Sequence, residues 1–201
     1  SWIIREMRKM ASSYSEREKD EARRAFMAQC THIDYSIRML LGTLRELSML
    51  DDTIIVFMSD HGDMLFDHGM VAKRLFYEGS AYIPLIFSGK PMQEYRGKGY
   101  EKKLCSIADV MPTLLSLCGI EDMPRMDGAP IFSDESREYI YGEVSEGAKA
   151  TRMIRSSRYK LIYYPAGNIF QLFDMENDRR EEHDLSSDPA MQDVIAAMEG
   201  K

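Results

Sequence analysis

The chain of 201 residues has no run of 18 apolar residues, which excludes a membrane-spanning helix. It also lacks a basic segment followed by an apolar one at its start, so we expect no signal peptide in this sequence. The chain has 26 Lys and Arg but 33 Asp and Glu. This acidic balance argues against nucleic acid as the main ligand, because binding of phosphates needs an excess of cationic residues. A small anionic substrate stays open, since a local pocket can be cationic in an acidic protein. The sequence gives no indication of compartment or oligomeric state.

Cysteine is scarce as well, with three residues and no C-x-x-C pair. An odd count without that pair argues against a disulfide framework or a zinc cluster. Cys30, Cys105 and Cys118 each lie in an apolar stretch, so we expect buried thiols that act as small hydrophobic side chains.

Hydrophobic periodicity, by contrast, is abundant in the first half of the chain. Apolar residues recur three and four apart over residues 16–50, which predicts one long helix with an apolar stripe, and the charges between residues 16 and 24 predict a solvated face. Residues 53–58 form a continuous apolar run, typical of a strand buried on both faces of a parallel sheet. Residues 82–87 predict a second strand, and Pro84 places it at an edge or near its start. Together these elements indicate an α/β unit.

The second half predicts shorter elements. Two stretches rich in Gly, Pro or charge read as loops, residues 89–103 and 121–136. Between them, residues 106–117 predict a short amphipathic helix capped by Ser106. A small antiparallel sheet and a final helix follow, predicted at residues 139–144, 159–164, 170–174 and 189–198.

The candidate chemistry begins where the first buried strand ends, at Asp60 and His61. Ligands of open α/β sheets bind beyond the carboxyl ends of strands. A carboxylate beside a single imidazole suits a hard divalent cation, although two ligands do not complete such a site. Asp51 and Asp52 cannot supply the rest, because they precede the same strand and lie roughly 23 Å away at about 3.3 Å per residue.

A longer pattern surrounds this pair. Residues 53–87 read TIIVFMSDHGDMLFDHGMVAKRLFYEGSAYIPLIF and resemble a block of the sulfatases of the alkaline phosphatase superfamily. In that family a strand ends in Ser/Thr-Asp-His/Asn-Gly, and a glycine-bearing loop then leads to a lysine, an aromatic-Glu-Gly segment and an apolar strand with proline. Residues 107–115 resemble the family's next helix, and residues 152–185 resemble its C-terminal sheet.

The resemblance implies roles for five residues. Asp60 and His61 would be ligands of a divalent metal ion, Ca²⁺ in the first place with Mg²⁺ or Mn²⁺ as alternatives. Lys73 would bind the sulfate group and act in catalysis, because an ammonium can neutralise sulfate oxygens as charge redistributes. His68 would be a second catalytic residue, and Arg74 would contact the substrate.

Two features of that family are missing. Its nucleophile, a formylglycine made from Cys or Ser within Cys/Ser-x-Pro/Ala-x-Arg, has no match here, and neither do the paired aspartates that follow its first strand. We therefore expect a truncated chain that is inactive alone, with the formylglycine in an N-terminal part. A shorter natural paralogue is the alternative.

The resemblance implies an α/β fold. Residues 1–135 would be the C-terminal portion of an alkaline-phosphatase-like, mostly parallel sheet with flanking helices. Residues 136–201 would be a small α+β subdomain, an antiparallel sheet with one helix. The parent protein would hydrolyse small-molecule or glycan sulfate esters. A phosphodiesterase or phosphonate monoester hydrolase of the same superfamily, or a non-catalytic sulfatase-like module, stays open.

Overall fold

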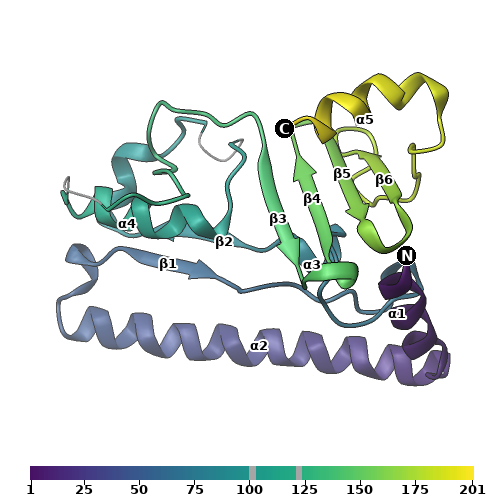
Figure 1. The fold of residues 1–201 in the computed structure, drawn as a ribbon. Coiled ribbons are helices and arrows are strands. Elements are labelled where there is room, and N and C mark those ends of the chain that lie inside the picture. Colours follow the sequence, from purple (N-terminus) through teal and green to yellow (C-terminus); the bar gives the residue numbers. More distant parts are fainter. Residues whose placement is uncertain (100–102, 121–123) are drawn as a thin grey trace. The chain divides into compact units, whose positions relative to one another are not determined.

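The computed structural model describes residues 1–99, 103–120 and 124–201, so the predicted loops lie partly outside the described residues, at 100–102 and 121–123. The chain divides into two compact units, residues 1–94 and residues 95–201 (Figure 1). The sequence predicted a different division, between a catalytic domain that ends at residue 135 and a subdomain that begins at residue 136. That division stays a prediction. In the described part of the chain, no helix combines the length and the apolar character needed to cross a membrane.

Two helices open the first unit. α1 (Trp2–Ser12) was not expected from the sequence, whereas α2 (Glu16–Glu46) confirms the predicted long helix. A capping box starts α2: the Ser15 hydroxyl accepts the N–H of Glu18, and the Glu18 carboxylate accepts the N–H of Ser15 at 2.8 Å.

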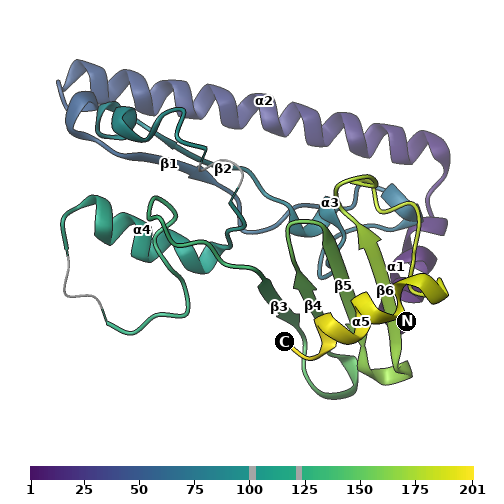
Figure 2. The same cartoon turned by 90° about the horizontal axis from the view of Figure 1, so that it is seen from above.

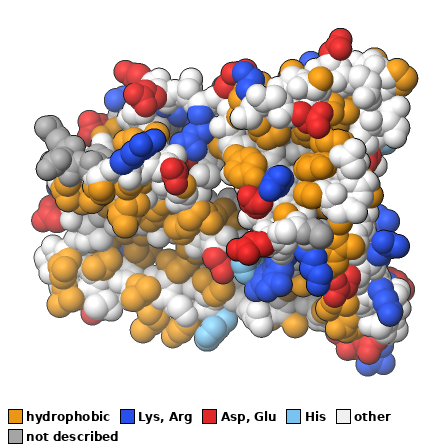
Figure 3. All heavy atoms as spheres, viewed as in Figure 1, with side chains coloured by type: hydrophobic (Ala, Val, Ile, Leu, Met, Phe, Trp, Pro, Cys, Tyr) orange, Lys and Arg blue, Asp and Glu red, His pale blue; other side chains and the backbone are white. Residues whose placement is uncertain are grey.

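The predicted apolar stripe of α2 is present, but no other element of the described chain buries it. No residue of α2 is buried, and Met27, Ile33 and Leu40 are 50–66% exposed. The helix is about 46 Å long at 1.5 Å per residue, whereas the two strands beside it in Figures 1 and 2 have four residues each. Hydrophobic side chains consequently gather along the helix surface in Figure 3.

The cysteines were expected to be buried. Cys30 and Cys118 are exposed instead, and Cys105 is half-buried.

The two strands of the first unit pair antiparallel, which corrects the expected parallel arrangement. β1 (Ile55–Met58) lies against β2 (Leu85–Ser88), with Met58 opposite Leu85 and Ile55 opposite Ser88. A parallel crossover is usually made by a helix that spans the sheet. The connection here contains only a single-turn helix, α3 (Glu78–Ala81), and a short 3₁₀ turn, η2 (Asp67–Gly69). The connection therefore joins the neighbouring ends of the two strands, from Met58 to Leu85.

The second unit contains a four-stranded antiparallel sheet in the order β3-β4-β5-β6. Its strands are β3 (Ile140–Val144), β4 (Thr151–Arg155), β5 (Tyr159–Tyr164) and β6 (Ile169–Asp174). Three of them were predicted, and β4 was not, because arginines interrupt its short apolar pattern. α4 (Val110–Leu117) confirms the helix predicted after Ser106, and α5 (Gln192–Glu199) confirms the last one.

The core of this sheet lies under α5. Leu161 of β5 and Leu172 of β6 pack against Ile195 and Met198 of α5, and all four side chains are buried. The predicted small antiparallel sheet with one helix is therefore present, and its core is built from residues of this unit alone.

Candidate functional site

The candidate site is the connection between β1 and β2, residues 59–84. Two methionines anchor it, since Met64 and Met70 are fully buried. The Met64 N–H donates to the Ala72 carbonyl at 2.9 Å, which ties the two sides of the loop together. The connection therefore has a fixed course although it contains little regular structure.

Glycine allows two segments of the connection to touch. The Gly62 N–H donates to the Ser80 carbonyl at 2.8 Å, and a Cβ on Gly62 would lie 2.1 Å from the Gly79 carbonyl oxygen. No side chain fits in that space, so a glycine is required. The residue that follows His61 is thereby pinned to α3, which fixes the direction in which Asp60 and His61 leave the strand.

The structure brings the predicted pair Asp60 and His61 into contact. The Asp60 Oδ1 accepts the His61 N–H at 2.9 Å, and its Oδ2 lies 3.3 Å from His61 Nε2. That backbone hydrogen bond lowers the pKa of the Asp60 carboxyl; burial opposes the shift, and the charges of His61 and Lys73 add to it. The carboxylate is therefore ionised at neutral pH and available to a cation.

The tautomer of His61 follows from its second contact. Its Nδ1 lies 2.8 Å from the Gly62 carbonyl oxygen, which can only accept, so Nδ1 carries a proton and Nε2 is the ring nitrogen that faces Asp60. The Asp60 Oδ2 and the His61 Nε2 are then the two atoms that face each other, 3.3 Å apart. Two ligands of one cation, each at roughly 2.3 Å and at about a right angle, have a similar separation. The geometry fits two adjacent ligands of a divalent ion.

The described residues do not complete a metal site by themselves. No group of three or more His, Cys, Asp or Glu side chains that could hold a metal ion occurs among them. Hard divalent cations take six or more ligands, so most would have to come from elsewhere. Asp51 and Asp52 lie in a 3₁₀ turn before β1, and Asp51 pairs with Lys90 at 3.4 Å, as expected for residues at the far end of the strand.

Lys73 and Arg74 lie on the exposed part of the loop. Lys73 is close enough to Asp60 for its charge to help lower the pKa of that carboxyl. Ala72 and Arg74, on either side of Lys73, have left-handed backbone with φ of 64° and 72°. The ammonium is thus presented from a constrained turn near the Asp60–His61 pair.

His68 has a different environment. Its ring lies 4.7 Å from the ring of Tyr77, which is only 3% exposed, so a buried side chain supports the imidazole. In the described part of the protein, no hydrogen bond joins this ring to Asp60, His61 or Lys73. His68 therefore belongs to the same loop, but the structure does not bring it into direct contact with the other predicted site residues.

Backbone strain concentrates in this loop. Of the nine non-glycine residues described with positive φ, five lie between positions 65 and 74. Each costs roughly 1–3 kcal/mol and persists only where surrounding contacts hold it, as is common at functional sites. Those contacts include Arg8 of α1 and Arg23 of α2, which donate to loop carbonyls. The sequence did not identify them, because arginine at the start of a charged helix predicts a solvated face.

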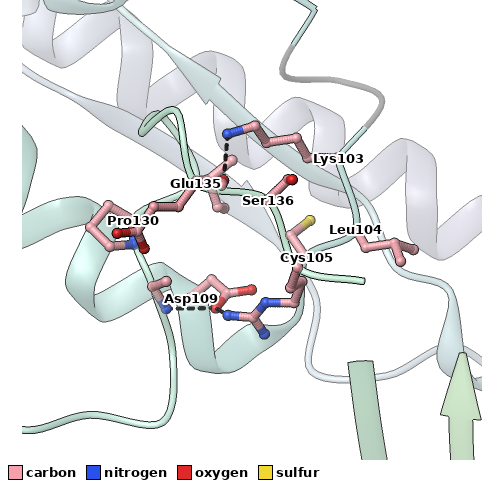
Figure 4. A pocket seen from close by; sticks show the side chains of 10 residues that line it. Lys103, Leu104, Cys105, Asp109, Pro130, Glu135 and Ser136 are labelled. Carbon is pink, nitrogen blue, oxygen red and sulfur yellow. Dashed lines mark hydrogen bonds and ion pairs between the residues drawn. The ribbon is translucent and has the colours of Figure 1, made fainter. Parts of the chain in front are cut away.

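A separate pocket of about 170 Å³ lies in the second unit (Figure 4). Asp109 lines it and is 2% exposed, and its carboxylate accepts bonds from Arg137 at 2.5 Å and from the Ala129 N–H at 2.9 Å. Burial and the Asp109 charge raise the pKa of the Cys105 thiol in the same pocket, which argues against a reactive thiolate. None of the predicted site residues lines this pocket.

Comparisons with known families cover the whole site. Residues 6–120 match the family described as Sulfatase, and residues 66–201 match the family described as N-sulphoglucosamine sulphohydrolase, C-terminal. The chain is 36% identical over 177 residues to a choline-sulfatase of Rhizobium meliloti, covering 84% of this chain and 34% of that protein. It is 33% identical over 168 residues to an arylsulfatase of Clostridium perfringens, covering 80% and 35%. The chain thus spans about a third of the length of these curated relatives.

Solved structures agree with this match. A 2-O GAG sulfatase, BT1596, superposes with a TM-score of 0.85 at 27% identity, covering 96% of this chain and 44% of that chain. A phosphonate monoester hydrolase of Agrobacterium radiobacter has a TM-score of 0.69 at 23% identity, covering 85% and 38%, and this likeness shows the fold alone. The predicted α/β class, with the architecture of alkaline-phosphatase-like enzymes, is confirmed.

Proposed function

We propose, from the premise that this chain belongs to the sulfatase family, that the protein containing it hydrolyses sulfuric esters. The observation that carries the proposal is the contact of Asp60 with His61 after β1, with the Lys73 charge near enough to act on Asp60. This arrangement supports a metal site and a sulfate-binding ammonium group in the connection that follows β1.

In this proposal Asp60 and His61 are two ligands of a divalent cation, Ca²⁺ before Mg²⁺ or Mn²⁺. The facing atoms Asp60 Oδ2 and His61 Nε2, 3.3 Å apart, support this assignment. Such an ion would supply electrostatic stabilisation of the sulfate oxygens. The Gly62 carbonyl keeps the His61 proton on Nδ1, and Asp60 provides the negative charge that makes the pair selective for a cation.

Lys73 is the proposed sulfate-binding and catalytic residue. Its ammonium is exposed and close to the Asp60–His61 pair, so one sulfate group could contact both. Fixed positive charge is most valuable where negative charge develops during S–O cleavage. Arg74 would add a second substrate contact, and His68, steadied by Tyr77, would be the second catalytic residue. The nucleophile would be a formylglycine supplied outside these 201 residues.

The substrates we propose are small-molecule or glycan sulfate esters. The names of the relatives, a choline-sulfatase, an arylsulfatase and a 2-O GAG sulfatase, support this breadth. A phosphonate or phosphate ester is the second candidate, because a phosphonate monoester hydrolase shares the fold. It has the weaker support, since the curated relatives at 33–36% identity are sulfatases.

The test is a side-by-side assay of the complete protein, stripped of metal and reloaded with Ca²⁺, Mg²⁺ or Mn²⁺. Aryl sulfate, choline sulfate and a sulfated disaccharide would be compared with the matching phosphate and phosphonate esters. We expect sulfate turnover to dominate. Faster turnover of the phosphorus esters would favour the second candidate, and no turnover of any ester would favour a non-catalytic module.

Two variants test the residue roles. Lys73→Ala should lower kcat by about a hundredfold or more, as loss of a single transition-state contact does. Asp60→Asn should weaken metal binding, measured by calorimetry, because a charged ligand is lost. Lys90→Ala is the matched control, since this exposed lysine pairs with Asp51 at the other end of β1. Equal effects of Lys73→Ala and Lys90→Ala would contradict the assignment of Lys73.

A further inference from the structure

Two arginines from separate helices hold the loop that carries His68. The Arg23 Nε of α2 donates to the Leu65 carbonyl at 3.0 Å, and the Arg8 Nε of α1 donates to the His68 carbonyl at 3.3 Å. Both carbonyls belong to residues with left-handed backbone, φ 45° and 54°. A charged donor makes a stronger bond than a neutral one, so the arginines oppose relaxation of this backbone.

Phe66, between these two carbonyls, provides a second attachment. Its backbone is also left-handed, with φ of 73°. The Arg23 guanidinium lies over its ring at 5.4 Å, the Lys19 ammonium at 5.9 Å, and the Tyr14 ring meets it edge-on at 5.6 Å. Arg23 therefore contacts the loop twice, through a carbonyl and through a ring. Only a planar guanidinium can donate at its edge while its face covers an aromatic side chain.

The effect of this contact extends to both ends of the loop. His68 follows Phe66 by two residues, and the Met64 N–H bonds to the Ala72 carbonyl at 2.9 Å, next to Lys73. Met64 and Met70 are fully buried, so the segment between them is anchored at both ends. A change at Leu65 and Phe66 is therefore passed to His68 and to the turn that presents Lys73.

We propose that Arg23 is a positioning residue for this site: through Leu65 and Phe66 it holds the loop in the left-handed conformation that places His68 and Lys73. The proposal rests on the sulfatase function proposed above, because it assigns Arg23 a part in that reaction. Arg23 acts from α2 and reaches the reacting groups only through the loop. Its partial pairing with Asp20 at 3.4 Å keeps the guanidinium oriented at the surface.

The experiment compares three variants of the complete protein. Arg23→Gln removes the charge and both contacts, and Arg23→Lys keeps the charge over the ring but loses the planar donor. Arg17→Gln is the matched control, since Arg17 lies on the same helix, is 87% exposed and pairs with Glu21 of that helix at 2.8 Å. The readouts are kcat and KM for a sulfate ester, the thermal midpoint, and amide hydrogen exchange of residues 64–72.

We expect Arg23→Gln to lower kcat by about tenfold to a hundredfold with little change in KM, because a misplacement near 1 Å can cost that much. Exchange at residues 64–72 should rise while the thermal midpoint follows that of Arg17→Gln. Arg23→Lys should recover part of kcat.

Equal kcat and equal exchange in Arg23→Gln and Arg17→Gln would overturn the proposal. A loss of kcat that only parallels a fall in the thermal midpoint would overturn it too, since it would indicate a merely structural role. If every variant lacks sulfatase activity, the proposed function fails, and with it the role of Arg23 in catalysis. The exchange data then still report whether Arg23 holds the loop.

Discussion

Gly62→Ala adds one methyl group at the point where two segments of the candidate site touch. The new Cβ would lie 2.1 Å from the Gly79 carbonyl oxygen, whereas ordinary contact begins at 3.4 Å, so the segments must separate by more than 1 Å. Gly62 follows His61 directly, and the displacement falls on the Asp60–His61 pair or on the bond from the Gly62 N–H to Ser80. Overpacking of this kind costs about 1–3 kcal/mol, and a shift of about 1 Å can cost a hundredfold in rate.

The assay uses the complete protein and measures Ca²⁺ affinity by calorimetry, kcat for a sulfate ester and the free energy of unfolding in urea. Gly42→Ala is the control: it lies within α2 with no neighbour within 4 Å of its Cβ, and alanine there should stabilise the helix by about 0.5–1 kcal/mol. We expect Gly62→Ala to lose metal affinity and kcat together. Unchanged Ca²⁺ affinity and kcat in Gly62→Ala would refute the reasoning.

Three further outcomes are expected. The purified 201-residue chain should not hydrolyse an aryl sulfate, because it lacks the nucleophile motif; turnover that Lys73→Ala abolishes would contradict this. Glu181→Gln should cost about 3–5 kcal/mol in urea unfolding, because it removes the charge 2.8 Å from the buried Lys160 ammonium. Glu143→Gln, which alters a solvent-screened pair of the same sheet, should cost far less. Equal losses in the two variants would contradict this prediction. Burial raises the pKa of Asp174, but hydrogen bonds from Arg158 and Asn177 outweigh it and hold that pKa below 3.8. The carboxylate therefore adds stability above about pH 4 that is lost as pH falls further, and Asp174→Asn should flatten this acid limb of the urea-unfolding curve.

Local signals predicted the elements that depend on neighbours in the chain. The 31 residues of α2 follow from apolar spacing. The turn between β5 and β6 follows from Pro165 to Asn168, where Asn168 adopts φ of 47°. Asp60 and His61 were identified because they follow an apolar run directly. In each case the informative residues lie within a few positions of one another, so backbone preferences and side-chain periodicity suffice.

Other features depend on residues that are distant in the sequence. The exposure of α2 could not be predicted from its stripe, because a stripe says only that a face is apolar and not what covers it. The antiparallel pairing of β1 and β2 depends on the course of the 26 residues between them, which contain no long helix to signal it. Arg23 gave no signal either, because its partner Leu65 lies 42 positions away.

The sequence by itself determined most helix and strand segments, with α1 and β4 as exceptions, the acidic balance, and the order of Asp60, His61, Lys73 and Arg74 along one connection. Only the tertiary structure decided that the Asp60 oxygen and the His61 nitrogen face each other at 3.3 Å, and that guanidinium groups from α1 and α2 hold the loop. The reason is physical: the first set depends on interactions within a few residues, whereas the second depends on which distant segments the packed chain brings within hydrogen-bonding distance.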